Sequence, residues 1–171
     1  MQATEVVALG FKYPTPTAAA DLSRAIEADT HSDVQRHMRR FVAEVGSLPL
    51  GEWEEIHTST LDLDPKFVPY VGHVAWGENY RRGAFMADMV AAMAEADVDL
   101  QGELPDHIEP ILRYLAATDE PFADLVEVLP GVIAEMNSVL KTALPDSPYR
   151  HLLAATLACA GNRPVTIGGR R

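Results

Sequence analysis

Apolar residues recur every three or four positions along most of this chain, and no segment shows the apolar–polar alternation of a half-buried strand. Such spacing places the apolar side chains on one face of an amphipathic helix. The pattern predicts helices in the following segments, of which the two that flank Asp64–Pro65 are short: 16–29, 30–45, 51–63, 65–77, 79–99, 108–115, 122–140 and 149–157.

The length of 171 residues is enough for one hydrophobic core, and 47% of the residues are hydrophobic. We therefore expect an all-α, single-domain helical bundle of roughly seven to nine helices with short connections. The expected domain covers residues 1–160, and a basic, glycine-rich tail follows at residues 161–171.

Three features within the predicted helices carry further expectations. Pro130 lacks an N–H group, so we expect a kink there. Gly83 costs about 1 kcal/mol relative to alanine in a helix, which favours a close backbone approach or an irregular first turn. The methionines of "FMADMVAAM" (85–93) suit either a core or an adaptable open groove. For Met89 and Met93 we expect the core.

The net charge of −11 is concentrated in the middle of the chain. Residues 95–135 contain eleven acidic residues and one basic residue, Arg113. Nucleic acid is a poor partner for such a surface, because binding to a phosphate backbone needs clustered Lys and Arg. A basic peptide would be attracted to it. The alternative is a solvated acidic face that serves only solubility.

Cysteine content and hydropathy indicate the compartment. The single cysteine, Cys159, excludes a disulfide within the chain, fits a reducing environment and lies in an apolar pattern where we expect burial. No signal-peptide pattern is visible at the start, and no segment reaches the ~18–20 apolar residues that span a bilayer. We expect a cytoplasmic protein without a membrane span.

Motifs for catalysis or metal binding are weak. The histidines form no HExxH motif, and no P-loop, GxGxxG or GxSxG motif is present. Glu54 and His57 share a helix face at i, i+3, but a di-metal bundle needs this motif twice together with further carboxylates. We expect no stable metal or cofactor site.

The stretch "GELPDHIEP" (102–110) places an acid next to an imidazole. Consecutive residues on a helix do not face each other, so Asp106 and His107 are a poor catalytic dyad. We interpret the stretch as the start of a helix, with Asp106 as the N-cap and Glu109 at N3 in an acidic capping box.

A run of aromatic and polar residues precedes this stretch, in "YVGHVAWGENYRRG" (70–83). Aromatic side chains beside acids would suit a peptide-binding groove, whereas ordinary core packing is the alternative for Trp76 and Tyr80. The run contains the following candidates: Tyr70, His73, Trp76, Glu78, Tyr80, Arg81 and Arg82.

These segments resemble the NarJ/TorD-type redox-enzyme maturation chaperones, and most closely the NarJ-like branch. The resemblance is carried by "TSTLDL" (58–63), "ELPDHIEPILRYLA" (103–116), "SPYRHLLAATL" (147–157) and the second motif formed by His73, Gly77, Glu78, Arg82 and Gly83. It covers residues 50–120 well and the rest of the chain loosely.

The resemblance implies a helical domain that is not an enzyme. Members of the family bind the N-terminal twin-arginine leader, or a leader-like segment, of a molybdoenzyme catalytic subunit. They hold the subunit in the cytoplasm until its molybdenum cofactor is inserted, and transient contact with that cofactor is compatible with this role. The resemblance places the following residues in the peptide-binding region, to which the aromatic run adds Tyr70 and Trp76: Leu104, Pro105, Asp106, His107, His73, Glu78, Arg82 and Gly83.

The chain departs from the family pattern at two points. Leu61 stands where an aromatic residue is common, and the chain is shorter than the chaperones of nitrate reductase. Related enzymes acting on selenate, chlorate, dimethyl sulfide or ethylbenzene fit as clients at least as well. We expect a monomer, with a domain-swapped dimer as the alternative.

Two other functions are compatible with the sequence. One is a small helical metal-dependent hydrolase that uses Glu54, His57, His73 and Asp106. The other is a helical adaptor unrelated to molybdoenzymes.

Overall fold

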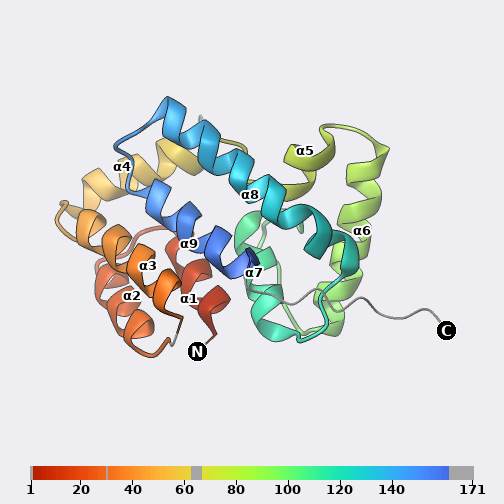
Figure 1. Ribbon diagram of the computed structural model, residues 1–171, viewed down its shortest axis with the longest axis horizontal. Coiled ribbons are helices and arrows are strands. Elements are labelled where there is room, and N and C mark those ends of the chain that lie inside the picture. The colour runs from red at the N-terminus through yellow and green to blue at the C-terminus, as the bar shows by residue number, and fades with distance from the viewer. Residues whose placement is uncertain (1, 30, 63–66, 162–171) are drawn as a thin grey trace.

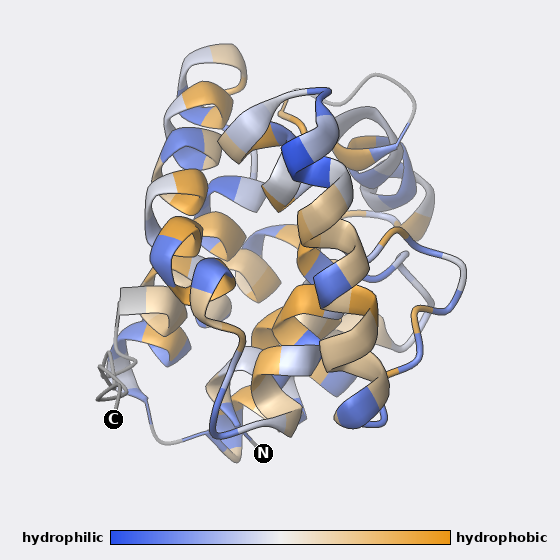
Figure 2. Cartoon of the chain, turned by 90° about the vertical axis from the view of Figure 1, so that its right-hand side faces the viewer, coloured by the Kyte–Doolittle hydropathy of each residue, from blue (hydrophilic) through white to orange (hydrophobic). Residues whose placement is uncertain are grey.

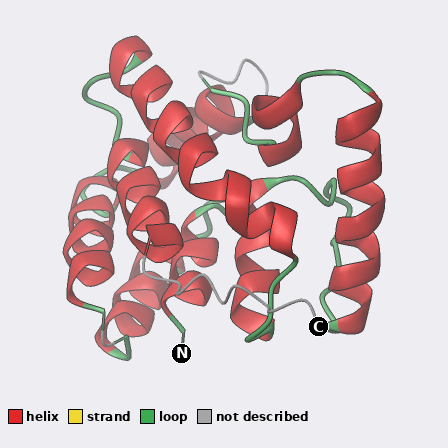
Figure 3. Ribbon diagram, turned by 45° about the vertical axis from the view of Figure 1, so that its right-hand side comes forward, coloured by secondary structure: helices red, strands yellow, loops and turns green. Residues whose placement is uncertain are grey.

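The computed structural model describes residues 2–29, 31–62 and 67–161, and in these residues it contains helices and no strand (Figures 1 and 3). The prediction of an all-α, single-domain bundle of seven to nine helices is confirmed. The helices are α1 (Ala3–Gly10), α2 (Ala18–Glu27), α3 (Ser32–Val45), α4 (Leu50–Leu61), α5 (Val71–Trp76), α6 (Tyr80–Glu95), α7 (Ile108–Ala117), α8 (Ala123–Ala143) and α9 (Tyr149–Gly161).

Helix α9 lies in the middle of the bundle, where it packs against α3 on one side and α8 on the other (Figure 1). Helix α2 covers α3, and α5 lies against α8 and α6. Helix α6 stands at the edge of the molecule (Figures 1 and 3). Hydrophobic and hydrophilic residues form alternating bands on the helices in Figure 2, as the periodicity predicts.

The sequence pattern did not reveal α1. Its residues Val6, Val7 and Ala8 are all buried, because α1 lies between α7 and α9. Glu5 is the one exposed residue of this helix, so it has no broad polar face to detect, and its valines favour strands rather than helices. The backbone of Gly10 comes so close to α9 that an added Cβ would lie 2.5 Å from Leu152 Cδ1. Tertiary packing therefore determines this helix.

The helix boundaries and the buried residues bear on three further predictions: the helix at 65–77, the kink at Pro130 and the burial of Cys159, Met89 and Met93. In the described part of the predicted segment 65–77 the helix is the short α5, and Tyr70 before it is extended; residues 65 and 66 lie outside the described residues. Helix α8 continues through Pro130, and the kink there stays a prediction. Cys159, Met89 and Met93 are buried, as expected.

The predicted boundary between the domain and its tail lies between residues 160 and 161. Helix α9 includes Gly161, and the rest of the predicted tail, at 162–171, lies outside the described residues. No helix of the described chain is long and apolar enough to cross a membrane.

Tyr149 links three helices at the centre of the core. Its ring lies edge-on to Phe41 of α3 at 5.3 Å between centroids. Its hydroxyl accepts from Trp53 Nε1–H at 3.3 Å and lies 2.8 Å from His57 Nδ1, and both of these residues belong to α4. Burial raises the pKa of Tyr149, so the hydroxyl remains protonated.

Replacing Tyr149 by phenylalanine should lower the free energy of unfolding by about 1–3 kcal/mol, because polar atoms of Trp53 and His57 lose their partner inside the core. Urea unfolding measures this change. The control is Tyr80→Phe, the same chemical change at a side chain that is 87% exposed, which should stay within about 0.5 kcal/mol of the unsubstituted protein. Equal effects at the two positions would contradict a structural role for the Tyr149 hydroxyl.

Candidate functional site

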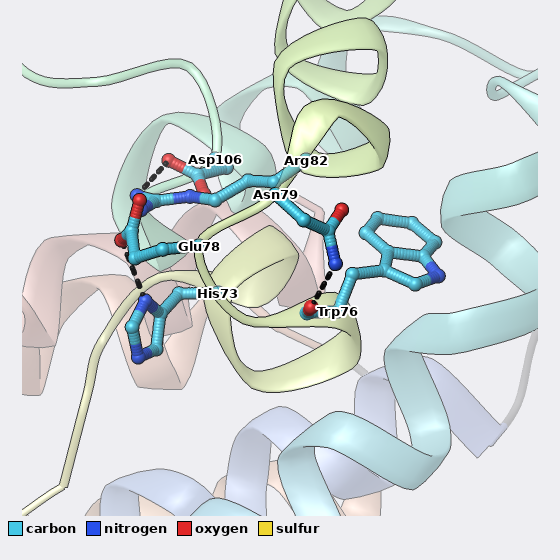
Figure 4. Close-up of polar contacts among 6 residues, drawn as sticks. All are labelled: His73, Trp76, Glu78, Asn79, Arg82 and Asp106. Atoms are coloured by element: carbon cyan, nitrogen blue, oxygen red, sulfur yellow. Dashed lines mark hydrogen bonds and ion pairs between the residues drawn. The ribbon is translucent and has the colours of Figure 1, made fainter.

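Arg82 of α6 lies at the centre of a group of polar side chains from α5, the turn between α5 and α6, and the segment before α7 (Figure 4). Its Nε–H donates to Asp106 Oδ2 at 2.8 Å, and its Nη1–H donates to Glu78. His73 Nδ1 lies 2.8 Å from the same Glu78 oxygen, and this hydrogen bond is the main cause that lowers the pKa of Glu78. We call Arg82, Asp106, Glu78 and His73 the ion cluster.

The ion cluster is buried on one side and exposed to solvent on the other. Asp106 is 0% exposed and Arg82 is 8% exposed, whereas Glu78 lies at the surface. A buried carboxylate without a partner would be strongly destabilising, so the guanidinium of Arg82 is required there. The surface acid Glu78 then holds the other side of the guanidinium.

Gly72 of α5 leaves the space in which the buried pair forms. A Cβ atom at this position would lie 2.9 Å from Asp106 Oδ2, 3.1 Å from Arg82 Cγ and 3.2 Å from Phe85 Cδ1. Gly83, by contrast, has open space around it, so the close backbone approach that we expected there is wrong. Nothing lies within 4 Å of a Cβ added at Gly83, and its N–H bonds regularly to the Asn79 carbonyl at 3.4 Å.

Backbone hydrogen bonds fix the segment before α5 to the start of α7. Val71 N–H donates to the Asp106 carbonyl at 2.7 Å, and Ile108 N–H donates to the Pro69 carbonyl at 3.0 Å. Tyr70 and His107 form an isolated antiparallel bridge, with their rings 5.3 Å apart edge to face. The "LPDH" stretch is thus held by both backbone and side chains.

The predicted capping role of Asp106 is wrong. The N-cap of α7 is His107, whose Nδ1 accepts from Glu109 N–H at 3.2 Å. Sequence preference favoured aspartate at a cap, but Asp106 has a stronger partner in Arg82. Glu109 consequently lies at N2 and not at N3.

The expectation that this corner displays Asp106 and His107 to a partner also needs correction. The Asp106 carboxylate points into the protein and is already paired, and His107 is only 8% exposed. Pro105 is buried, and Leu104 is the exposed residue of the four at 46%.

The aromatic run divides into two environments. Tyr70 belongs to the ion cluster side, where Arg82 lies 5.6 Å from its ring centroid. Trp76 lies on the other side of α5 and points away from Arg82 (Figure 4). The Trp76 ring is 5.0 Å from Phe85 and 5.2 Å from the Arg81 guanidinium, so it packs while remaining partly exposed.

A cavity of about 330 Å³ lies beside His107, between the end of α1, the end of α4 and the segment before α7. We call it the acidic pocket. It is lined by Phe11, Lys12, Tyr13, His57, Leu61, Asp62, Gln101, Glu103, His107 and Glu109. Among these, His107 is the only residue in the peptide-binding set predicted from sequence.

Asp62 and Glu103 supply the acidic character of this pocket and outnumber its one lining cation, Lys12, and all three side chains are exposed. Glu109 is buried and neutralised, since Arg113 donates to its two oxygens at 2.9 and 3.0 Å. Tyr13 adds an exposed aromatic ring edge-on to His57, at 5.3 Å. The pocket combines negative charge with apolar surface.

The two histidines of the pocket are held neutral by burial. Burial is the main cause that lowers the pKa of His57, and Asp62 only partly opposes it. Burial likewise lowers the pKa of His107, against the opposing charges of Glu103 and Glu109. Neutral imidazoles at neutral pH serve as hydrogen-bonding groups here.

In the described part of the chain, no group of three or more His, Cys, Asp and Glu side chains could hold a metal ion. Three of the four residues that the hydrolase alternative would use have other partners: His57 bonds to Tyr149, His73 to Glu78, and Asp106 to Arg82.

No protein-family model matches the chain, and no curated protein matches it.

Alanine at Gly72 and at Gly83 should change stability in opposite directions. Both residues lie in helices, where alanine is intrinsically better by about 1 kcal/mol. At Gly83 space is open, so Gly83→Ala should stabilise by up to about 1 kcal/mol. At Gly72 the new Cβ meets the buried ion pair, so Gly72→Ala should destabilise by about 1–3 kcal/mol. Thermal and urea unfolding of the two variants test this, and a stable Gly72→Ala variant would contradict the close packing.

Stability should fall as the pH drops below 6.5, because His57 and His107 have pKa values lowered from 6.5 in the folded state. Below that pH the unfolded chain binds protons that the folded chain does not, so the free energy of unfolding decreases. The stabilisation is fully present above 6.5. Urea unfolding at pH 7.5 and 5.5 measures the loss.

The variant His107→Asn isolates one histidine in this measurement. Asparagine is a good N-cap and retains an acceptor for Glu109 N–H, but it does not titrate. The variant should lose less stability between pH 7.5 and 5.5 than the unsubstituted protein. An identical loss would show that His107 does not contribute.

Proposed function

We propose that this protein is a maturation chaperone of the NarJ/TorD type. In this role it binds the N-terminal twin-arginine leader, or a leader-like segment, of a molybdoenzyme catalytic subunit in the cytoplasm. It assists insertion of the molybdenum cofactor before export or assembly. It has no catalytic cycle of its own and no stably bound cofactor.

The observation that carries the proposal is the acidic pocket. The pocket adjoins "ELPDHIEPILRYLA" (103–116), the longest segment on which the family resemblance rests. It offers exposed carboxylates from Asp62 and Glu103 beside the rings of Phe11 and Tyr13. A leader that joins guanidinium groups to an apolar stretch has the complementary chemistry.

The ion cluster supports this function indirectly. Arg82 and Asp106 neutralise each other inside the protein, so they are poor direct contacts for a leader. Their pairing holds the segment 104–107 against α5 and α6, and that segment forms one wall of the pocket through His107. In this proposal the ion cluster positions the wall, and the pocket contacts the peptide.

Calorimetry tests the binding. The probe is a synthetic peptide with two adjacent arginines followed by an apolar segment. Glu103→Gln and Asp62→Asn should each weaken binding about tenfold, because each removes one charge-assisted contact. Replacing the arginines of the peptide by glutamine, or raising the salt concentration, should weaken it as well.

The matched control is Asp88→Asn, which removes an exposed acid of α6 that does not line the pocket. It should leave the affinity within about twofold. If the affinity is unchanged by Glu103→Gln, by Asp62→Asn, by replacing the arginines of the peptide and by raising the salt concentration, binding by charge in this pocket is refuted. Purification of the tagged protein from its native host gives an independent test: a molybdoenzyme large subunit should accompany it, and consistent absence of any redox subunit would contradict the chaperone function.

A further inference from the structure

His107 presents a hydrogen-bond donor to the acidic pocket. Its Nδ1 accepts from Glu109 N–H at 3.2 Å, and a ring nitrogen that accepts carries no hydrogen. The hydrogen of the neutral ring is therefore on Nε2. This atom has no hydrogen-bond partner among the described residues, although the side chain is only 8% exposed and lines the pocket.

His57 presents a second donor by the same reasoning. The Tyr149 hydroxyl oxygen accepts from Trp53 Nε1–H at 3.3 Å, which leaves its own hydrogen to be donated to His57 Nδ1 at 2.8 Å. The hydrogen of the imidazole is then on Nε2. The nearest carboxylate oxygen, Asp62 Oδ2, lies 3.9 Å from Nε2, which is too far for a hydrogen bond.

Donors that face a pocket bond to water or to an acceptor of a bound ligand, and the charge of the pocket restricts what that acceptor is attached to. An anion would satisfy the two imidazoles and would be attracted by Lys12, but the carboxylates of Asp62 and Glu103 outweigh that single positive charge. A simple cation would satisfy the carboxylates but would leave both N–H groups without a partner. A ligand that carries a cationic group and a neutral carbonyl oxygen a few bonds apart satisfies both.

The size and shape of the pocket narrow the ligand further. A volume of about 330 Å³ is near the lower limit of ~300–1,000 Å³ for ligand pockets, so it holds one residue rather than a long segment. Tyr13 lines the pocket and is 53% exposed, and a planar guanidinium stacks on an aromatic ring better than a lysine ammonium does. Arginine also has the donors to bridge two carboxylates.

We propose that the acidic pocket binds a single arginine residue of a peptide, with its guanidinium on Asp62 and Glu103 and its main-chain carbonyl oxygen on Nε2–H of His57 or His107. This proposal rests on the proposed function, because a leader supplies the arginine. It adds that the peptide backbone is recognised together with the charge, and it makes His57 and His107 specificity-determining residues.

Titration followed by nuclear magnetic resonance tests the proposal on the full chain. The probe is Nα-acetyl-arginine methylamide, which has both recognition groups. It should shift the signals of residues 57–62 and 103–107 and of the imidazole Nε2–H groups. n-Butylguanidine, which keeps the single guanidinium charge but lacks the carbonyl, should bind at least about threefold more weakly. The citrulline analogue, which lacks the charge, should bind about tenfold more weakly.

Two variants and one control complete the test. Glu103→Gln should weaken binding of the arginine probe about tenfold. His107→Asn, which keeps the helix cap, should weaken it about threefold and should leave the affinity for n-butylguanidine unchanged. Asp88→Asn should have no effect. The proposal is wrong if n-butylguanidine binds as well as the arginine probe, or if the shifted signals lie outside the pocket.

The failure of this proposal can be told apart from failure of the proposed function. If the twin-arginine peptide binds but the arginine probe does not perturb the pocket, the leader uses another surface and the present inference is overturned. If the probe binds the pocket but no redox subunit accompanies the protein from its host, the arginine site stands and the chaperone function is refuted.

Discussion

The charge of Asp106 is the constraint on which this part of the structure depends. Its carboxylate is completely buried. Removing a charge from water costs free energy, and a buried charge is tolerated only where a partner of opposite charge accompanies it. Arg82 of α6 is that partner. Helix α6 stands at the edge of the bundle (Figure 1), so this ion pair is one of the contacts that orient its first turn. The glycine at position 72 follows from the same constraint, because only a residue without a Cβ leaves room for the pair.

Much of the fold was accessible from sequence, because the helices bury one face each. Helix α3 illustrates this, since Val34, Met38, Phe41 and Val45 form the predicted stripe and all are buried. Helix α1 was missed because it packs against several neighbouring helices, so only one of its residues, Glu5, is exposed and its polar face is too narrow to give a pattern. Amphipathic periodicity reports a helix at the surface of a core and is silent about one inside it.

The site was only partly accessible from sequence, for two different physical reasons. The residues of the ion cluster were all identified, but Asp106 was given a local role as a cap because its true partner lies 24 residues away. Local hydrogen-bond preferences rank the choices that a residue has near itself in sequence, and a buried ion pair outweighs them. The acidic pocket was hidden because Phe11–Tyr13, His57–Asp62 and Gln101–Glu109 come together only in the fold. None of those segments carries a signal for the others.

The ion cluster and the pocket meet at His107. The buried pair of Arg82 and Asp106 therefore affects the position of a side chain that lines the pocket. Asp106 is fixed by Arg82, and its carbonyl is fixed by Val71 N–H. The next residue, His107, must therefore begin α7 at a defined position, where Glu109 N–H occupies Nδ1. Because one ring nitrogen is committed to the helix cap, the other is committed as a donor towards the pocket. A cap made by aspartate would have satisfied the helix equally well and would have presented no such donor. The choice of histidine at this cap thus has a consequence outside the helix, and the buried ion pair keeps the donor in place.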